Sequence, residues 1–371
     1  MNAADRFHLH ISRRAMATDF EILLPQSLEA GQIDAAVLAL EMLEPIEAAL
    51  TVYQKESEVS RLNRQAFHEP VKVGPLVLDI LQHAVRLSAA TQGAFDVTAG
   101  PLIDAWGFTT RSGRRPTAEQ IRTARGHVGW QHLEIDPEAS TVRFGVPEMR
   151  INLGAIGKGY ALDRIAARLR SAGIGDFLLH GGNSSLIAAG SAIPASDPPQ
   201  RPELSSPPQA SPPQSTRLGS PAAEDSAAAE PELQESEPRE SGWRVGLRHP
   251  TRTQRHAGGI TLRDMALATS GSGKQHFHFR GRRYGHVIDP RSGYPAGDYL
   301  SLSVLAPAAT DADAIATGLF VGSRALIERY AAEHPEHGII AVAAGEREGS
   351  TRTETWNVSS DVWSPHEEET G

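Results

Sequence analysis

Cysteine is absent from the 371 residues of this sequence. Its absence excludes disulfide bonds, thiolate metal sites, cysteine nucleophiles and lipid anchors attached through a thiol. Long apolar runs are also missing, because no stretch reaches the ~18 residues that a transmembrane helix needs. The N-terminal segment contains Arg13-Arg14, but the apolar region of a secretory signal does not follow it. The sequence therefore predicts a cytoplasmic protein with no membrane span.

Basic side chains are fewer than acidic ones, with 36 Lys and Arg against 45 Asp and Glu, so the formal net charge is −9. Two segments hold this excess. Residues 191–242 carry nine acidic and three basic side chains, and residues 361–371 carry four acidic side chains and no Lys or Arg. The rest of the chain is close to neutral, without the basic stripe of a nucleic-acid-binding protein. No nucleic-acid partner is expected.

Aromatic side chains are missing from residues 191–242, which hold 11 of the 25 prolines. Proline fixes φ and lacks the backbone N–H, and a segment without aromatics buries too little apolar surface to offset its ordering entropy. This composition predicts a disordered insert between two strand-like segments, 177–180 and 243–247. A long insertion there costs little, because loop-closure entropy grows only logarithmically with length. Pro199-Gln-Arg-Pro202 also matches a PxxP peptide ligand, which leaves an interaction role open.

The rest of the chain mixes helical and strand-like patterns without an internal repeat, which predicts one large α+β domain. No GxGxxG follows a strand, so a dinucleotide-binding Rossmann unit is not expected. We assign residues 1–190 to the first part of the domain, 243–360 to its second part and 361–371 to an acidic disordered tail. Apolar periodicity predicts helices at 32–50, 75–91, 117–126, 156–172 and 311–334, the last with a break near Gly322. Strands are predicted at 19–24, 129–135, 177–180, 243–247, 301–306 and 338–343.

One predicted helix opens with Thr310-Asp-Ala-Asp313-Ala-Ile-Ala-Thr317, in which Thr310 or Asp311 suits the N-cap. Asp313 and Thr317 are four residues apart and therefore share a helix face. A carboxylate and a hydroxyl are hard oxygen donors, which suit Mg²⁺ bound together with phosphate oxygens. The alternative is structural, because an early aspartate favours the helix dipole and a helical threonine often bonds to the carbonyl four residues earlier.

A second candidate is the glycine-rich entry into the helix predicted at 156–172, which contains Lys158. Backbone N–H groups and a lysine at a helix start favour an anion such as a phosphate. The alternative is a glycine-rich turn with a solvated lysine. A third candidate is His286, which comes just before an apolar pair of residues and could face a ligand. The alternative is structural, because a lone histidine is usually part of the fold. Asp289 in the following turn fits a structural cap.

These segments, in this order, resemble the ApbE family of FAD:protein FMN transferases. The resemblance covers about residues 15–335 apart from the insert. The segments that carry it are Met16-Ala-Thr18, Ser57-Glu-Val-Ser-Arg-Leu-Asn63, Phe95-Asp-Val-Thr-Ala-Gly-Pro-Leu102 with Trp106-Gly-Phe108, Asn152-Leu-Gly-Ala-Ile-Gly-Lys-Gly-Tyr160, His180-Gly-Gly182, Ala268-Thr-Ser-Gly271, His286-Val-Ile-Asp-Pro-Arg-Ser-Gly293 and Ala312-Asp-Ala-Ile-Ala-Thr317.

The resemblance implies an α+β enzyme of the ApbE type, related to the T-fold, with mixed sheets and flanking helices. It implies Mg²⁺-dependent transfer of FMN from FAD to a Thr or Ser hydroxyl of an acceptor flavoprotein, with release of AMP. The implied metal ligands are Asp313, Thr317 and a main-chain carbonyl near Ala155, and the implied catalytic residues are His286 and Asp313. The implied contacts to FAD come from Met16, Asn63, Ala94, Phe95, Asp96, Asn152, Lys158 and His286.

Some positions depart from the family pattern, which puts an extra metal contact or the choice of acceptor in question. The family often has Asp at the positions of Asn152, Asn183 and Ser272, Ala at Gly157 and a second His at Gly285. Two other functions stay open at this point. One is an FAD pyrophosphatase, in which water replaces the acceptor hydroxyl, and the other is a non-catalytic flavin-binding or adaptor protein that acts through the proline-rich insert.

Overall fold

The computed structural model describes residues 9–25, 28–110, 112–192, 242–252, 254–271, 276–280, 282–296, 298–347 and 350–366. The predicted disordered insert, 191–242, lies outside the described residues except for its first two residues and its last one. Ser272 also lies outside them.

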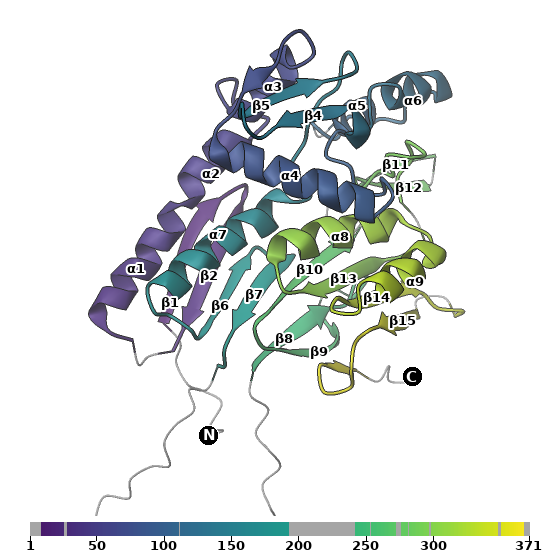
Figure 1. Ribbon diagram of the computed structural model, residues 1–371. Coiled ribbons are helices and arrows are strands. Elements are labelled where there is room, and N and C mark those ends of the chain that lie inside the picture. The colour runs from purple at the N-terminus through teal and green to yellow at the C-terminus, as the bar shows by residue number, and fades with distance from the viewer. Residues whose placement is uncertain are drawn as a thin grey trace, which may run out of the picture.

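An eight-stranded antiparallel sheet forms the centre of the molecule, in the order β1-β2-β6-β7-β10-β13-β14-β15 (Figure 1). Strands from both sides of the predicted insert share this sheet, because β7 pairs with β10 in the register Ala188↔Met265. The two parts of the chain therefore form one sheet. The strands are β1 (Leu9–Ala15), β2 (Thr18–Leu24), β6 (Phe177–Gly181), β7 (Ser185–Ala189), β10 (Met265–Gly271), β13 (Ser301–Ala306), β14 (Gly338–Ala344) and β15 (Thr351–Trp356).

Helices cover one face of this sheet, with α7 and α8 lying side by side against its central strands (Figure 1). Buried apolar side chains between the helices and the sheet form the main core, for example Ile165 on α7 and Ile315 on α8. Burial of such side chains supplies most of the folding free energy. The helices of this layer are α1 (Ala30–Glu41), α2 (Leu43–Leu50), α4 (Pro75–Ala90), α7 (Gly157–Ser171), α8 (Ala309–Val321) and α9 (Arg324–Glu333).

A small three-stranded sheet, β16-β9-β8, covers part of the opposite face of the large sheet. It consists of β8 (Trp243–Arg248), β9 (His256–Leu262) and β16 (Trp363–Pro365). Trp363 is 7% exposed and pairs with Ile260. The predicted tail at 361–371 is therefore ordered at least to His366, because a buried tryptophan attaches it to β9. The expectation of disorder from residue 361 was wrong at this boundary.

The remaining elements lie at one end of the helical layer, beyond α4 (Figure 1). They are α3 (Glu58–Gln65), β3 (Val71–Lys72), α5 (Gly100–Ala105), α6 (Ala118–Arg125), the 3₁₀ turn Trp130–His132, β4 (Leu133–Asp136), β5 (Thr141–Phe144), and the hairpin of β11 (His276–Phe279) and β12 (Arg282–Gly285). Strands β3, β5 and β4 form a separate small sheet.

The helix predicted at 32–50 consists of two helices that meet at Met42. Pro45 lies in the first turn of α2, where it cannot donate to the carbonyl four residues earlier, so one continuous helix cannot form. The predicted break near Gly322 is present between α8 and α9. Among the described residues, no helix combines the length and the apolar character that a membrane crossing requires.

Candidate active site

A cavity of about 770 Å³ is lined by the start of α7, the end of β10 and one face of α8. Segments on both sides of residues 193–241 contribute to its wall. Nine of the eleven predicted site residues line this cavity: Ala94, Phe95, Asp96, Asn152, Ala155, Lys158, His286, Asp313 and Thr317. Residues that are far apart in the sequence therefore meet at one site.

Asp313 is the most enclosed charged group of the cavity, with 5% of its surface exposed. Its Oδ2 accepts a hydrogen bond from the backbone N–H of Gly159 (3.1 Å), and its Oδ1 accepts one from the hydroxyl of Ser185 (3.2 Å). The ammonium of Lys158 lies 3.5 Å from Oδ2. A buried carboxylate needs such partners to remain charged, so these contacts hold a fixed negative group beside the cavity.

Glycine at position 159 permits the close approach of α7 and α8. A Cβ there would lie 2.1 Å from the carbonyl oxygen of Ala309 and 2.9 Å from the Cβ of Asp313. Any larger residue would force the two helices apart, because contacts under about 3 Å do not occur between such atoms. The absence of a side chain therefore brings the Gly159 N–H to the Asp313 carboxylate and places Lys158 next to it.

Thr317 lies one turn after Asp313 on α8 and lines the same cavity. Its hydroxyl donates to the backbone carbonyl of Asp313 (3.1 Å) and lies 2.9 Å from the hydroxyl of Ser270. The structural alternative for this threonine is therefore present in the molecule. A hydroxyl oxygen that donates one hydrogen bond still has lone pairs to offer, so this bond does not prevent metal coordination.

The available donors fit a hard cation such as Mg²⁺. Asp313, Thr317 and Ala155 all border the cavity and offer a carboxylate, a hydroxyl and a main-chain carbonyl, and all three are oxygen donors of the kind that Mg²⁺ prefers. The carboxylate provides the negative charge, and Mg²⁺ usually completes its shell with water and substrate phosphate oxygens.

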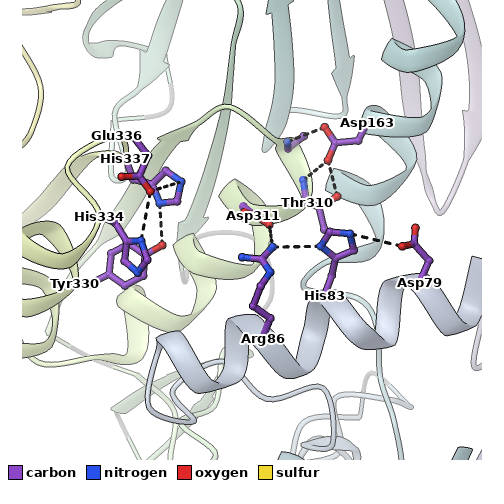
Figure 2. Close-up of polar contacts among 11 residues, drawn as sticks. Asp79, His83, Arg86, Asp163, Thr310, Asp311, Tyr330, His334, Glu336 and His337 are labelled. Atoms are coloured by element: carbon purple, nitrogen blue, oxygen red, sulfur yellow. Dashed lines mark hydrogen bonds and ion pairs between the residues drawn. The ribbon is translucent and has the colours of Figure 1, made fainter. Parts of the chain in front are cut away.

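A carboxylate from α7 caps the N-terminus of α8. Asp163 accepts the backbone N–H groups of Ala309 (2.9 Å) and Thr310 (2.8 Å), and also the Thr310 hydroxyl (2.5 Å) (Figure 2). Burial raises the pKa of the Asp163 carboxyl, and these hydrogen bonds oppose the increase. The N-cap residue is Ala308, so the prediction of Thr310 or Asp311 was wrong, because a residue distant in the sequence provides the cap.

Asp96 lies in the cavity wall with both carboxylate oxygens engaged. Oδ1 accepts from the backbone N–H and the hydroxyl of Thr98, and Oδ2 accepts from the backbone N–H of Trp130. Burial raises the pKa of Asp96, although these hydrogen bonds lower it. Asp96 therefore holds two loops together beside the buried ring of Phe95. Asn152 is similarly engaged, because its side-chain oxygen accepts from the Gly154 N–H (2.9 Å).

Met16 and Asn63 do not line the cavity. Asn63 makes a reciprocal pair of hydrogen bonds with the backbone of Ile151, at 3.0 and 2.7 Å, and so fixes the residue before Asn152. Met16 lies in the turn between β1 and β2 with φ 50°, next to Ala17 with φ 60°. Two successive positive φ values are typical of the tight turns that join hairpin strands.

His286 lines the cavity and stands edge-on to the ring of Phe108, with ring centroids 6.4 Å apart. His249, which the sequence analysis did not identify, also lines the wall and is 6% exposed. Its Nδ1 accepts from the backbone N–H of Arg252 (3.0 Å), and its Nε2 lies 3.2 Å from the Thr351 hydroxyl. No motif surrounds His249 in the sequence, so only its proximity to the cavity reveals it.

Comparisons with known proteins identify the family of this chain. The model of the ApbE family matches residues 16–217 and 230–341. The chain belongs to the ApbE family. A relative from Vibrio cholerae named FAD:protein FMN transferase is 30% identical over 322 residues, which is 84% of this chain and 81% of that protein. A protein of the same name from Haemophilus influenzae is 28% identical over 326 residues, with 84% and 80% covered.

Solved ApbE structures share the fold. The ApbE protein of Thermotoga maritima superposes with a TM-score of 0.73 at 24% identity, covering 93% of this chain and 96% of that one. The flavin transferase ApbE of Vibrio cholerae gives 0.68 at 25% identity, covering 94% and 97%. The predicted ApbE family and α+β fold class are confirmed.

Of the departures from the family pattern, Asn183 lines the cavity and Gly157 is the first residue of α7.

Proposed function

We propose that this ApbE protein transfers FMN from FAD to a Thr or Ser hydroxyl of an acceptor flavoprotein, with Mg²⁺ as cofactor and AMP as the second product. The observation that carries this proposal is the buried carboxylate of Asp313, which lies beside Lys158 and one turn before Thr317 in a cavity of about 770 Å³. Ligand pockets commonly have volumes of roughly 300–1,000 Å³. Two curated relatives that match most of the chain bear the name FAD:protein FMN transferase, which supports the same reaction.

In this reaction the acceptor hydroxyl oxygen forms a bond to the FMN phosphorus, and the bond from that phosphorus to the AMP oxygen breaks. The hydroxyl proton must pass to a base, and the departing AMP carries away the electron pair of the broken bond. Negative charge accumulates on the pyrophosphate oxygens along this path, so fixed positive groups accelerate the reaction.

Different residues of the cavity would supply the metal ligands, a second positive group, the base and the apolar wall for this reaction. Asp313, Thr317 and the Ala155 carbonyl would hold Mg²⁺, which when bound neutralises phosphate charge. Lys158 supplies a second positive group next to Asp313. His286, which lines the cavity, would take the hydroxyl proton, which is the role that histidine most often fills. Phe95 and Ala94 form an apolar wall that suits a flat ring of FAD.

The test combines the purified protein, FAD, Mg²⁺ and an acceptor protein with a threonine-containing flavinylation segment. We expect the acceptor to gain the mass of one FMN while AMP appears in equal amount. Free FMN formed at the same rate without acceptor would instead establish a pyrophosphatase. Absence of both AMP and acceptor labelling would contradict the proposal and favour a binding protein.

Two substitutions on α8 distinguish an effect on the metal site from a general effect on the helix. Asp313→Asn keeps the size of the side chain but removes the charge, and we expect Mg²⁺-dependent transfer to fall by at least ~100-fold. Asp311→Asn is the matched control, because Asp311 pairs with Arg86 on α4 at 2.6 Å and does not line the cavity. Full transfer by the Asp313 variant would refute the ligand assignment.

A further inference from the structure

A cluster of two histidines and one glutamate lies in the turn between α9 and β14. One ligand atom from each of His334, Glu336 and His337 lies within 4.8 Å of the other two (Figure 2). Glu336 Oε1 is 3.4 Å from Nδ1 of His334 and 3.8 Å from Nε2 of His337. The carboxylate oxygen therefore faces a ring nitrogen of each histidine. None of the three residues lines the active-site cavity.

The surroundings of the cluster hold the His337 ring in one orientation. The hydroxyl of Tyr330 lies 2.9 Å from Nδ1 of His337, which leaves Nε2 for the cluster. Histidines that bind metals usually have the second ring nitrogen fixed by such a hydrogen bond. Tyr330 also stacks on His334, with ring centroids 4.4 Å apart.

The backbone of the turn is fixed as well. The side-chain amide nitrogen of Asn357, which follows β15, lies within hydrogen-bonding distance of the carbonyls of Ala331 (2.8 Å), His337 (3.2 Å) and His334 (3.3 Å) and donates its two N–H groups among them. The turn therefore has little freedom to open. Of the three side chains in the cluster, Glu336 is the most exposed at 52%, compared with 32% for His334 and 8% for His337. Glu336 can therefore move by the small distance that metal coordination needs.

We propose that His334, Glu336 and His337 form a second metal site, which binds a divalent transition metal of the Zn²⁺ type. Two imidazole nitrogens and one carboxylate oxygen suit Zn²⁺, whereas Mg²⁺ prefers oxygen donors alone. With three protein ligands, a water molecule would complete a tetrahedral shell. A bound ion would join the end of α9 to the start of β14, so this site stabilises the fold and does not depend on the transferase reaction.

A structural alternative explains only part of this arrangement. Positively charged residues stabilise a helix C-terminus, and His334 is the C-cap residue of α9. That effect accounts for His334 near the helix end. It does not account for His337, which is buried and whose second nitrogen faces the same carboxylate oxygen.

The test measures Zn²⁺ binding by competition with a chromophoric chelator, using the full chain and the variants Glu336→Gln and His334→Gln. We expect one tightly bound Zn²⁺ per wild-type chain. The affinity should be at least ~100-fold lower in each variant, because losing a direct ligand costs more than the roughly 10–100-fold lost with an outer-shell partner. Zn²⁺ should also raise the melting temperature of the wild type more than that of either variant. The matched controls are His83→Gln on α4 and Glu328→Gln on α9, which should bind Zn²⁺ like the wild type.

Because Asp313 could also bind added Zn²⁺, the same titration is repeated with Asp313→Asn. Retention of the tight site in this variant supports the proposal, whereas its loss would place the ion in the active site and overturn it. Absence of saturable binding by the wild type would also overturn it, as would equal affinity of the wild type and the Glu336 and His334 variants. These outcomes do not depend on whether FMN transfer is observed.

Discussion

The contact between α7 and α8 makes Gly159 the most sensitive small residue of the site. In Gly159→Ala the new Cβ would lie 2.1 Å from the Ala309 carbonyl oxygen, where an ordinary contact begins at 3.4 Å. The helices must therefore separate locally by roughly 1.3 Å, unless the backbone distorts. Because the Gly159 N–H and Lys158 both contact the Asp313 carboxylate, this movement changes the site directly.

Gly159→Ala should lower both the free energy of unfolding and the rate of FMN transfer. Overpacking of a well-packed core costs about 1–3 kcal/mol, so the free energy of unfolding should fall by that amount. A displacement of about 1 Å at a reacting group reduces turnover by up to ~100-fold. We therefore expect a folded protein with reduced stability and a much larger relative loss of FMN transfer.

The measurement pairs urea unfolding with the acceptor-labelling assay and uses Gly157→Ala as the control. Position 157 is in the same helix, two residues earlier, and the nearest atom to a new Cβ is 3.9 Å away on Leu50. Alanine also favours a helix over glycine, so this control should keep its activity and at least wild-type stability. If Gly159→Ala matched Gly157→Ala in both assays, the inferred tight contact between the helices would be wrong.

Two further predictions concern proton transfer and acid stability. His286→Asn should lower kcat for FMN transfer by about 10²–10⁴-fold, whereas His83→Asn should leave kcat unchanged. An unchanged kcat in the His286 variant would exclude His286 as the base. Because burial raises the pKa of Asp163 above its ordinary value of 3.8, the native state binds this proton more tightly than the unfolded chain does. The contribution of Asp163 to stability is therefore lost as the pH rises through the raised pKa. The wild type should therefore gain unfolding free energy relative to Asp163→Asn as the pH falls towards 3.8, and a constant difference in urea unfolding between pH 7 and 4 would contradict this.

Helices with a clear apolar periodicity and strands rich in residues of high strand propensity could be predicted from the sequence. In these elements the local sequence pattern agrees with the burial of the side chains in the structure. The helices expected at 75–91 and 156–172 match α4 and α7 within one residue at each end. The strand predicted at 129–135 begins only at Leu133, after a 3₁₀ turn. Several strands were missed, among them β7 and β10. Their sequences, Ser-Leu-Ile-Ala-Ala and Met-Ala-Leu-Ala-Thr-Ser-Gly, are rich in small residues with low strand propensity. Such residues suit these strands because α8 packs closely on both of them.

The same distinction applies to the active site. Features set by residues that are close in the sequence could be predicted, whereas features set by the packing of distant segments could not. The shared face of Asp313 and Thr317 follows from helix geometry alone. The position of Lys158 beside Asp313 does not, because it depends on the packing of two helices that are far apart in the chain. The Asp163 cap was missed for the same reason, since capping rules consider only neighbours in the sequence. Asn63 was placed near FAD by family resemblance, but its hydrogen bonds are to the backbone of Ile151.

The separation of 154 positions between Gly159 and its acceptor on Asp313 also matters during protein synthesis. At ribosomal rates of about 5–20 residues per second, the carboxylate is made roughly 8–30 s after the glycine. During that interval the surface of α7 that later contacts α8 has no permanent partner within the chain. Until α8 has been synthesised, the nascent chain would therefore expose the face of α7 that later packs against α8. Molecular chaperones would have time to bind this face before the active site can assemble.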